Sequence, residues 1–166
     1  MFDGRGRLSI FRIAVIGAII GVVLIVGGLL ALNADQNSRR APLIVDPYPG
    51  AQIWGEAVED SPTNISYFMR VNNTSPDQVL QYYQSKLTAF AASDRCVRTP
   101  GQGELPVDPA QPNSIPYRYD CLFDRSSRNA TQYTRVSIFP EMPGMDPYSS
   151  DDENNTIIQY VQVWQP

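Results

Sequence analysis

A charge-free apolar run lies near the N-terminus, where residues 13–32 read IAVIGAIIGVVLIVGGLLAL. An α-helix rises about 1.5 Å per residue, so a run of this length spans about 30 Å, the thickness of the hydrocarbon core of a bilayer. A helix also satisfies its backbone hydrogen bonds internally, as a lipid-exposed segment must. The run therefore predicts one transmembrane helix with a folded domain behind it.

The flanks of this run bear on its orientation. Residues 1–12 carry three arginines against one aspartate, while Arg39 and Arg40 follow the run. The positive-inside rule favours a cytoplasmic tail at 1–12. A cleaved signal peptide is the alternative, but its apolar region is usually about 7–15 residues long. We therefore favour an uncleaved signal anchor, with residues 33–46 as a polar linker and residues 47–166 outside the cytoplasm.

One side of the predicted helix is lined by small residues. At 100° per residue these residues fall within about 100° of one another, interrupted by Leu24. They are Ala14, Gly17, Gly21, Gly28 and Ala31. Small side chains let a second helix approach closely in lipid, so we expect a helix-docking face here. The alternative is that glycine is simply frequent in membrane helices.

The composition excludes several kinds of chemistry. Residues 33–166 carry 10 basic and 16 acidic side chains, a net charge of −6, which argues against nucleic acid or anionic lipid as the main partner. The chain has no histidine, so histidine-dependent catalysis, the usual zinc sites and histidine-ligated haem are excluded. The sequence contains no phosphate-binding glycine motif, and Lys86 is its only lysine. We expect no enzyme and no catalytic, metal or cofactor-binding residue.

Hydrophobic periodicity predicts the fold class behind the anchor. Strands are expected at residues 52–58, 65–71, 95–99, 117–124, 131–139 and 156–164. One helix is expected to begin at Ser75, with Pro76 in its first turn and Gln78 completing a capping box. Its apolar side chains recur at helical spacing, and Tyr83 is expected in the core with Tyr82 at its border. The pattern indicates an α+β domain, a small antiparallel sheet with one packed helix.

The two cysteines fall on successive predicted strands. A hairpin would bring Cys96 and Cys121 opposite each other, so we expect a disulfide, with two buried free thiols as the alternative. The bond would be worth about 3 to 4 kcal/mol on the chain-entropy model. A disulfide requires an oxidising compartment, which agrees with a domain outside the cytoplasm.

An acidic stretch lies near the C-terminus, within residues 146–153. Calcium binding and a solvated loop are the two interpretations. The spacing of the carboxylates differs from that of an EF-hand loop, so we favour the solvated loop.

Two short motifs carry a resemblance over about residues 46–90. They are Y-P-G-A at residues 48–51 and S-P-D-Q-V-L-Q-Y-Y at residues 75–83. Together they resemble small bacterial membrane-anchored extracytoplasmic domains that have a Y-P-G-A turn and an S-P-x-x-V-L-x-x-Y helix start. This resemblance implies an α+β fold outside the membrane and no established reaction. In outline the chain is also similar to single-helix accessory subunits of bacterial electron-transfer complexes such as alternative complex III.

These observations lead to two functional hypotheses. The first is a non-catalytic accessory subunit of a bacterial inner-membrane complex, with electron transport as one candidate process. Its partners would be other integral membrane subunits and membrane lipid, with no nucleic acid and no small-molecule substrate. The second is a free-standing anchored binding module that uses the exposed sheet edge or the Tyr117 and Tyr119 region.

Overall fold

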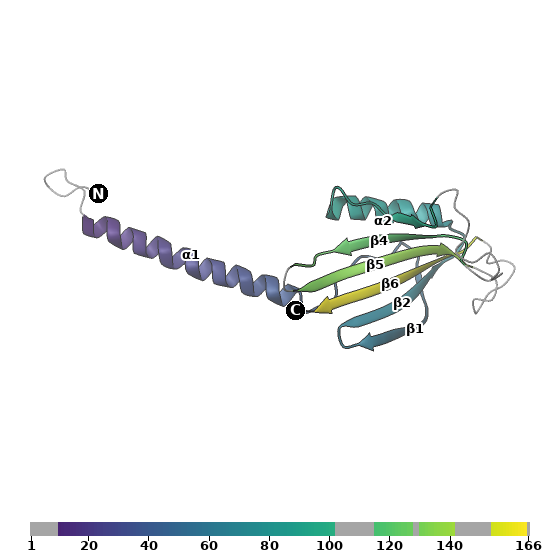
Figure 1. Ribbon diagram of the computed structural model, residues 1–166, viewed down its shortest axis with the longest axis horizontal. Helices are drawn as coiled ribbons and strands as arrows, with labels where there is room; N and C mark the ends of the chain where they lie inside the picture. The colour runs from purple at the N-terminus through teal and green to yellow at the C-terminus, as the bar shows by residue number, and fades with distance from the viewer. Residues whose placement is uncertain (1–9, 102–114, 128–129, 142–153, 166) are drawn as a thin grey trace. The chain divides into compact units, whose positions relative to one another are not determined.

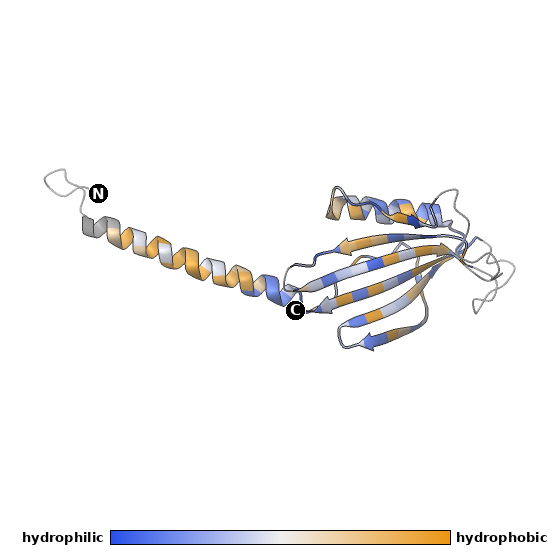
Figure 2. Ribbon diagram, in the orientation of Figure 1, coloured by the Kyte–Doolittle hydropathy of each residue, from blue (hydrophilic) through white to orange (hydrophobic). Residues whose placement is uncertain are grey.

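The computed structural model describes residues 10–101, 115–127, 130–141 and 154–165, and it divides into two compact units, Met1–Ser38 and Arg39–Pro166. The first contains helix α1, Ile10–Ser38 (Figure 1), and Figure 2 shows that its described residues are mainly apolar. Its segment Ala14–Ser38 is long and apolar enough to cross a membrane. The helix predicted over 13–32 is confirmed. Residues 1–9 of the predicted tail lie outside the described residues.

The second unit, called the domain below, is a six-stranded sheet with one helix, α2 (Pro76–Phe90). The strands are β1 (Gln52–Ser61), β2 (Asn64–Val71), β3 (Val97–Thr99), β4 (Arg118–Asp124), β5 (Thr131–Pro140) and β6 (Thr156–Gln165). Their order is β1-β2-β6-β5-β4-β3, and all neighbours are antiparallel. The predicted α+β class is confirmed.

One face of the sheet forms the core. Helix α2 packs over β4, β5 and β6 on this face (Figure 1). Because strand side chains alternate, the register places Tyr160 of β6 between Tyr67 of β2 and Val136 of β5. Tyr160 and Val136 have no exposed surface. Strand β6 lies inside the sheet, as its apolar sequence predicts.

Helix α2 begins as its sequence predicts. The backbone N–H of Ser75 donates to the Gln78 side chain at 3.3 Å, and Pro76 is the first helical residue. The buried residues of the helix are Pro76, Val79, Tyr83 and Leu87. Their spacing of three and four residues forms the single apolar stripe that faces the sheet.

The linker expected over residues 33–46 needs correction. Its first part, residues 33–38, continues α1, and from Arg39 the chain belongs to the domain. Three side chains of the sheet donate hydrogen bonds to its carbonyls: Gln132 to Ala41 at 2.8 Å, Gln162 to Leu43 at 3.1 Å, and Thr134 also to Leu43. Val45 is buried in the core. Buried polar groups need partners, and here these backbone carbonyls supply them.

Two side chains of α2 also contact the chain at Asp46 and Pro47. The Tyr82 hydroxyl donates to the carbonyl of Pro47 at 2.9 Å, and Lys86 Nζ lies 2.7 Å from Asp46 Oδ2. The Arg39 guanidinium donates to the carbonyl of Arg125, just after β4. The chain therefore enters the domain where β4 ends and β5 begins, and we call this the Arg39 end of the domain.

Tyrosine side chains fill the centre of the core. The hydroxyls of Tyr83 and Tyr160 are hydrogen-bonded to each other, and the backbone N–H of Tyr48 donates to the Tyr83 hydroxyl at 2.9 Å. The Tyr67 ring stacks on Tyr160 with 4.9 Å between centroids, and Tyr82 meets Tyr83 edge to face at 5.0 Å. Tyr83 is fully buried and Tyr82 only partly, as predicted.

This cluster predicts that the domain loses stability in alkali. Burial raises the pKa of Tyr83 and of Tyr160 above the ordinary value of about 10. Below pH about 10 both hydroxyls are neutral in the folded and unfolded states, so they contribute no pH dependence there. Above pH about 10 these two hydroxyls ionise in the unfolded chain but stay protonated in the folded core. The free energy of unfolding therefore falls as pH rises.

We expect tyrosinate absorbance to rise in two steps, the second coinciding with loss of the sheet signal in circular dichroism. Urea-unfolded chain, in which all tyrosines are solvated, should titrate in one step near pH 10. Complete ionisation of a domain that is still folded would contradict the prediction.

Candidate interaction surfaces

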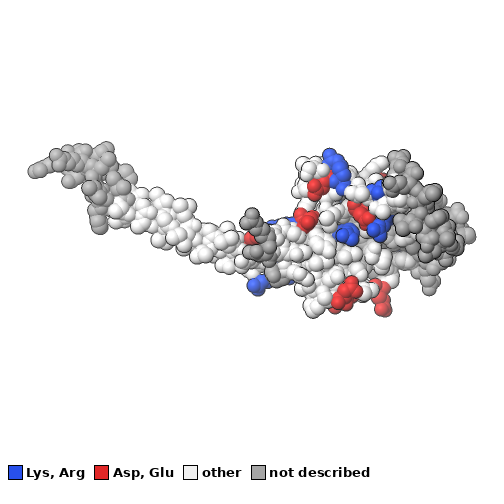
Figure 3. Space-filling model, in the orientation of Figure 1, with Lys and Arg blue, Asp and Glu red and all other residues white. Residues whose placement is uncertain are grey.

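The small-residue side of α1 is open along its length. Ala14, Gly17, Gly28 and Ala31 are exposed, and Gly21 is partly exposed. A Cβ atom added at Gly17, Gly21 or Gly28 would meet nothing within 4 Å, apart from the neighbouring backbone of the helix. On the face that Figure 3 shows, the described apolar part of the helix has no charged side chain, and residues 14–32 contain none. This side therefore offers a smooth surface to a second helix.

The predicted disulfide is present. Cys96 and Cys121 are bonded, with 4.2 Å between their Cα atoms. The register of β3 on β4 pairs Val97 with Asp120, so the two cysteines fall directly opposite each other at the next position. The bond closes the hairpin at the end where β3 begins. Cys121 is fully buried, whereas Cys96 is partly exposed.

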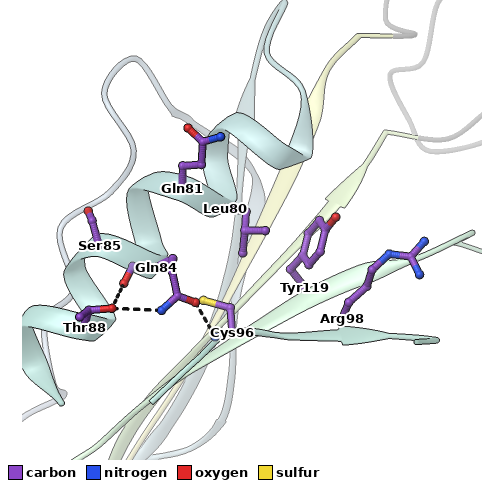
Figure 4. A pocket seen from close by; sticks show the side chains of 8 residues that line it. All are labelled: Leu80, Gln81, Gln84, Ser85, Thr88, Cys96, Arg98 and Tyr119. Atoms are coloured by element: carbon purple, nitrogen blue, oxygen red, sulfur yellow. Dashed lines mark hydrogen bonds between the residues drawn. The ribbon is translucent and has the colours of Figure 1, made fainter. Parts of the chain in front are cut away.

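A groove runs beside the disulfide, between α2 and the β3–β4 hairpin (Figure 4). Its volume is about 570 Å³. It is lined by Leu80, Gln81, Gln84, Ser85 and Thr88 of α2 and by Cys96, Arg98 and Tyr119 of the hairpin. Leu80, the disulfide and the Tyr119 ring provide apolar surface, and the amides and hydroxyls of α2 provide hydrogen-bonding groups.

Gln84 organises one end of this groove. Its amide nitrogen donates to the Thr88 hydroxyl at 3.1 Å and to the Asp94 carbonyl at 3.3 Å. Its amide oxygen accepts the backbone N–H of Cys96 at 2.9 Å. This last bond satisfies an edge donor of the sheet without a further strand. The side chain thereby fixes the hairpin against α2.

Arg98 and Tyr119 lie at the other end of the groove, and Tyr117 contacts both of them from outside the lining. The Tyr119 hydroxyl donates to Asp77 Oδ1 at 2.6 Å, and the Tyr117 ring lies 5.7 Å from that of Tyr119. The Arg98 guanidinium carbon lies 4.8 Å from the centre of the Tyr117 ring, and its Nη1 donates to the Pro100 carbonyl at 2.8 Å. Burial, followed by the bond to Asp77, raises the pKa of Tyr119 above its ordinary value.

The described residues include no cluster of three histidine, cysteine or carboxylate side chains that would hold a metal ion. The bond to Asp46 raises the pKa of Lys86, opposite to what an amine nucleophile requires. Both described cysteines are in the disulfide. The groove combines apolar surface with hydrogen-bonding groups, an arrangement that suits binding of another molecule. The acidic stretch within 146–153 lies outside the described residues.

Sequence reasoning did not single out Gln84 or Arg98. Gln84 reads as an ordinary polar residue on the solvent side of α2, and its bond to Cys96 spans 12 residues. A weak signal was present, since Cys96 directly precedes a short edge strand and its backbone N–H needs an acceptor. The Tyr117 and Tyr119 region, by contrast, was among the sequence-based candidates.

No protein-family model matches the chain, and no curated protein or solved structure is detectably similar to it. The class of protein therefore has to be defined from its fold and surfaces. Among the described residues, one helix is long and apolar enough to cross a membrane, and an α+β domain with a disulfide follows it.

Proposed function

We propose that this protein is a non-catalytic accessory subunit of a bacterial inner-membrane complex, and that an electron-transport complex is one such assembly. Helix α1 docks laterally on the membrane helices of larger subunits. The domain lies on the periplasmic or extracellular side, where its disulfide is stable. The subunit contributes binding surface and no reaction.

The observation that carries this proposal is the open small-residue side of α1. A helix needs only apolar side chains to stay in lipid, and apart from Ala18 and Gly27 bulky aliphatic ones fill the rest of this span. At Gly17 and Gly21 a partner backbone can approach to van der Waals contact, where dispersion and Cα–H···O contacts accumulate. The groove beside the disulfide, with its apolar and hydrogen-bonding lining, also favours a binding role.

Replacing Gly17 and Gly21 together by leucine tests the docking side. Leucine keeps the span apolar, so membrane insertion should survive. It places two bulky side chains where close packing is required, so we expect at least a tenfold loss of the co-purified partner, equivalent to about 1.4 kcal/mol. The measurement is mass spectrometry of subunits captured in mild detergent, normalised to the inserted protein.

Ile19 and Val23 provide the matched control, because they are exposed and lie off the small-residue side. Leucine at both positions should leave capture unchanged. Equal capture by both pairs of variants would show that the glycine side is not the docking surface. A wild-type chain that leaves native membranes as a lone monomer would contradict the accessory-subunit proposal.

The groove beside the disulfide favours a second candidate, a free-standing anchored binding module. Its volume falls within the range of ligand sites, and its lining combines apolar surface with a few polar groups. The replacement Leu80→Arg would fill this groove without touching α1. A loss of ligand or peptide capture from this variant, with subunit co-purification intact, would favour the binding module.

A further inference from the structure

We infer that an apolar hollow at the Arg39 end of the domain contacts the lipid surface of the membrane in which α1 is anchored. The inference rests on the proposed membrane anchoring and adds a second point of attachment. The hollow has a volume of about 350 Å³. Its apolar lining includes Ile44, Ala89, Phe90 and Phe123, and Lys86 and Asp46 stand at the polar side.

Two of these side chains are turned outward by the fold. Ile44 is 80% exposed, while Val45 beside it is 8% exposed, because the extended segment alternates between solvent and core. Phe90, the last residue of α2, is 42% exposed, and its ring meets the edge of Phe123 at 5.7 Å. An isolated exposed apolar residue is ordinary, but an aliphatic and an aromatic side chain around one hollow form a contact surface.

The covalent path to the anchor favours lipid as the occupant. Only eleven residues separate Leu32, the last residue of the apolar run, from Ile44. The hollow-forming segment is thus the part of the domain that follows the span most directly. Bonds from Gln132, Thr134 and Gln162 hold this segment on the sheet, so Ile44 is presented from a fixed backbone.

The charges at this end fit a lipid surface as well. Arg39 and Arg40 directly follow α1, and Arg39 is bonded to the carbonyl of Arg125, two residues beyond Phe123. Lys86 lines the hollow and is paired with Asp46 at 2.7 Å. Apolar side chains beside arginines are the chemistry of interfacial membrane contacts, in which the rings and aliphatic groups enter the acyl boundary and the cations meet phosphates.

Tryptophan quenching in vesicles tests the inference on the full chain. In a background with Trp54→Phe and Trp164→Phe, Ile44→Trp or Phe90→Trp places one fluorophore at the hollow. The vesicles contain phosphatidylcholine and phosphatidylglycerol with or without bromine on the acyl chains. Interfacial side chains enter the headgroup and acyl boundary by about 5–10 Å, so we expect brominated lipid to reduce emission at both positions roughly twofold.

Ile53→Trp and Val97→Trp are the matched controls, since Ile53 is 76% and Val97 62% exposed and neither lines the hollow. They should remain unquenched. Leu24→Trp, within the span, reports on the anchor itself. Quenching of the Leu24 variant without quenching at 44 and 90 overturns the lipid contact and leaves the anchoring intact. If the Leu24 variant is not quenched, both the lipid contact of the hollow and the membrane anchoring by α1 are overturned.

Photoreactive lipid gives a second measurement on the unmodified chain. A diazirine on the acyl chain, activated in vesicles, should label peptides that contain Ile44 and Phe90 as well as α1. Label confined to α1 would overturn the inference. Crosslinks from this hollow to a protein partner in native membranes, with no lipid adduct, would also overturn it.

Discussion

The replacement Arg70→Met should lower the free energy of unfolding by about 3 kcal/mol, because it removes the cation from a buried carboxylate. Arg70 Nε donates to Glu141 Oε2 at 2.8 Å, and the Glu141 side chain has no exposed surface. The Asn155 amide donates to the same oxygen at 3.1 Å, and one neutral donor does not replace a charge. Urea unfolding of the full chain in detergent, followed by circular dichroism, measures the loss.

Arg118→Met is the matched control for this prediction. Arg118 also pairs with a carboxylate, that of Asp120, at 2.9 Å, but its side chain is 50% exposed. Water screens such a pair, so we expect a loss below about 1 kcal/mol. Equal losses from the two variants would mean that burial of Glu141 does not determine the stability of its pair.

Replacing Cys96 and Cys121 together by alanine should cost about 3 to 4 kcal/mol, since the bond restricts the unfolded chain between residues 25 apart in sequence. The buried position of Cys121 adds a small packing loss. The same urea titration gives the value. The effect should be confined to the domain, with the helical signal of α1 retained.

Reduced wild type is the control for the cysteine variant. Its midpoint should shift by nearly the same amount, because it also lacks the cross-link. Intact-mass measurement after alkylation under non-reducing conditions reports the state in cells. Two alkylated thiols in protein taken from native membranes would contradict both the disulfide in the mature chain and the proposed side of the membrane.

Much of the fold follows from local sequence patterns. A run such as 13–32 predicts a membrane-length helix because each apolar residue adds its own favourable free energy of transfer into lipid. Summed over the whole run, this free energy is large. The start of α2 is equally local, since Ser75, Pro76 and Gln78 act within one turn. The alternation that puts Tyr67 and Met69 on one face of β2, with Ser66, Phe68 and Arg70 on the other, likewise assigns one face to the core. For the cysteines, a hairpin prediction was sufficient to place them opposite each other.

The surfaces depend on contacts that sequence patterns do not contain. Residues 39–46 read as a polar linker, yet Gln132, Thr134 and Gln162 bond to their carbonyls from 91 or more positions away. The groove exists because Gln84 meets Cys96 and because α2 lies beside the β3–β4 hairpin. Such contacts join elements only after the strand order and register are set.

The sequence by itself determined the apolar span, the α+β class, the position of α2 and the cysteine pair, because each arises from periodicity or spacing within a few turns or one hairpin. Only the tertiary structure decided that the chain from Arg39 completes the core, that Arg70 meets Glu141, and that Ile44 and Phe90 share one hollow. These outcomes follow from packing between distant segments, where a side chain's partner depends on the register of the whole sheet.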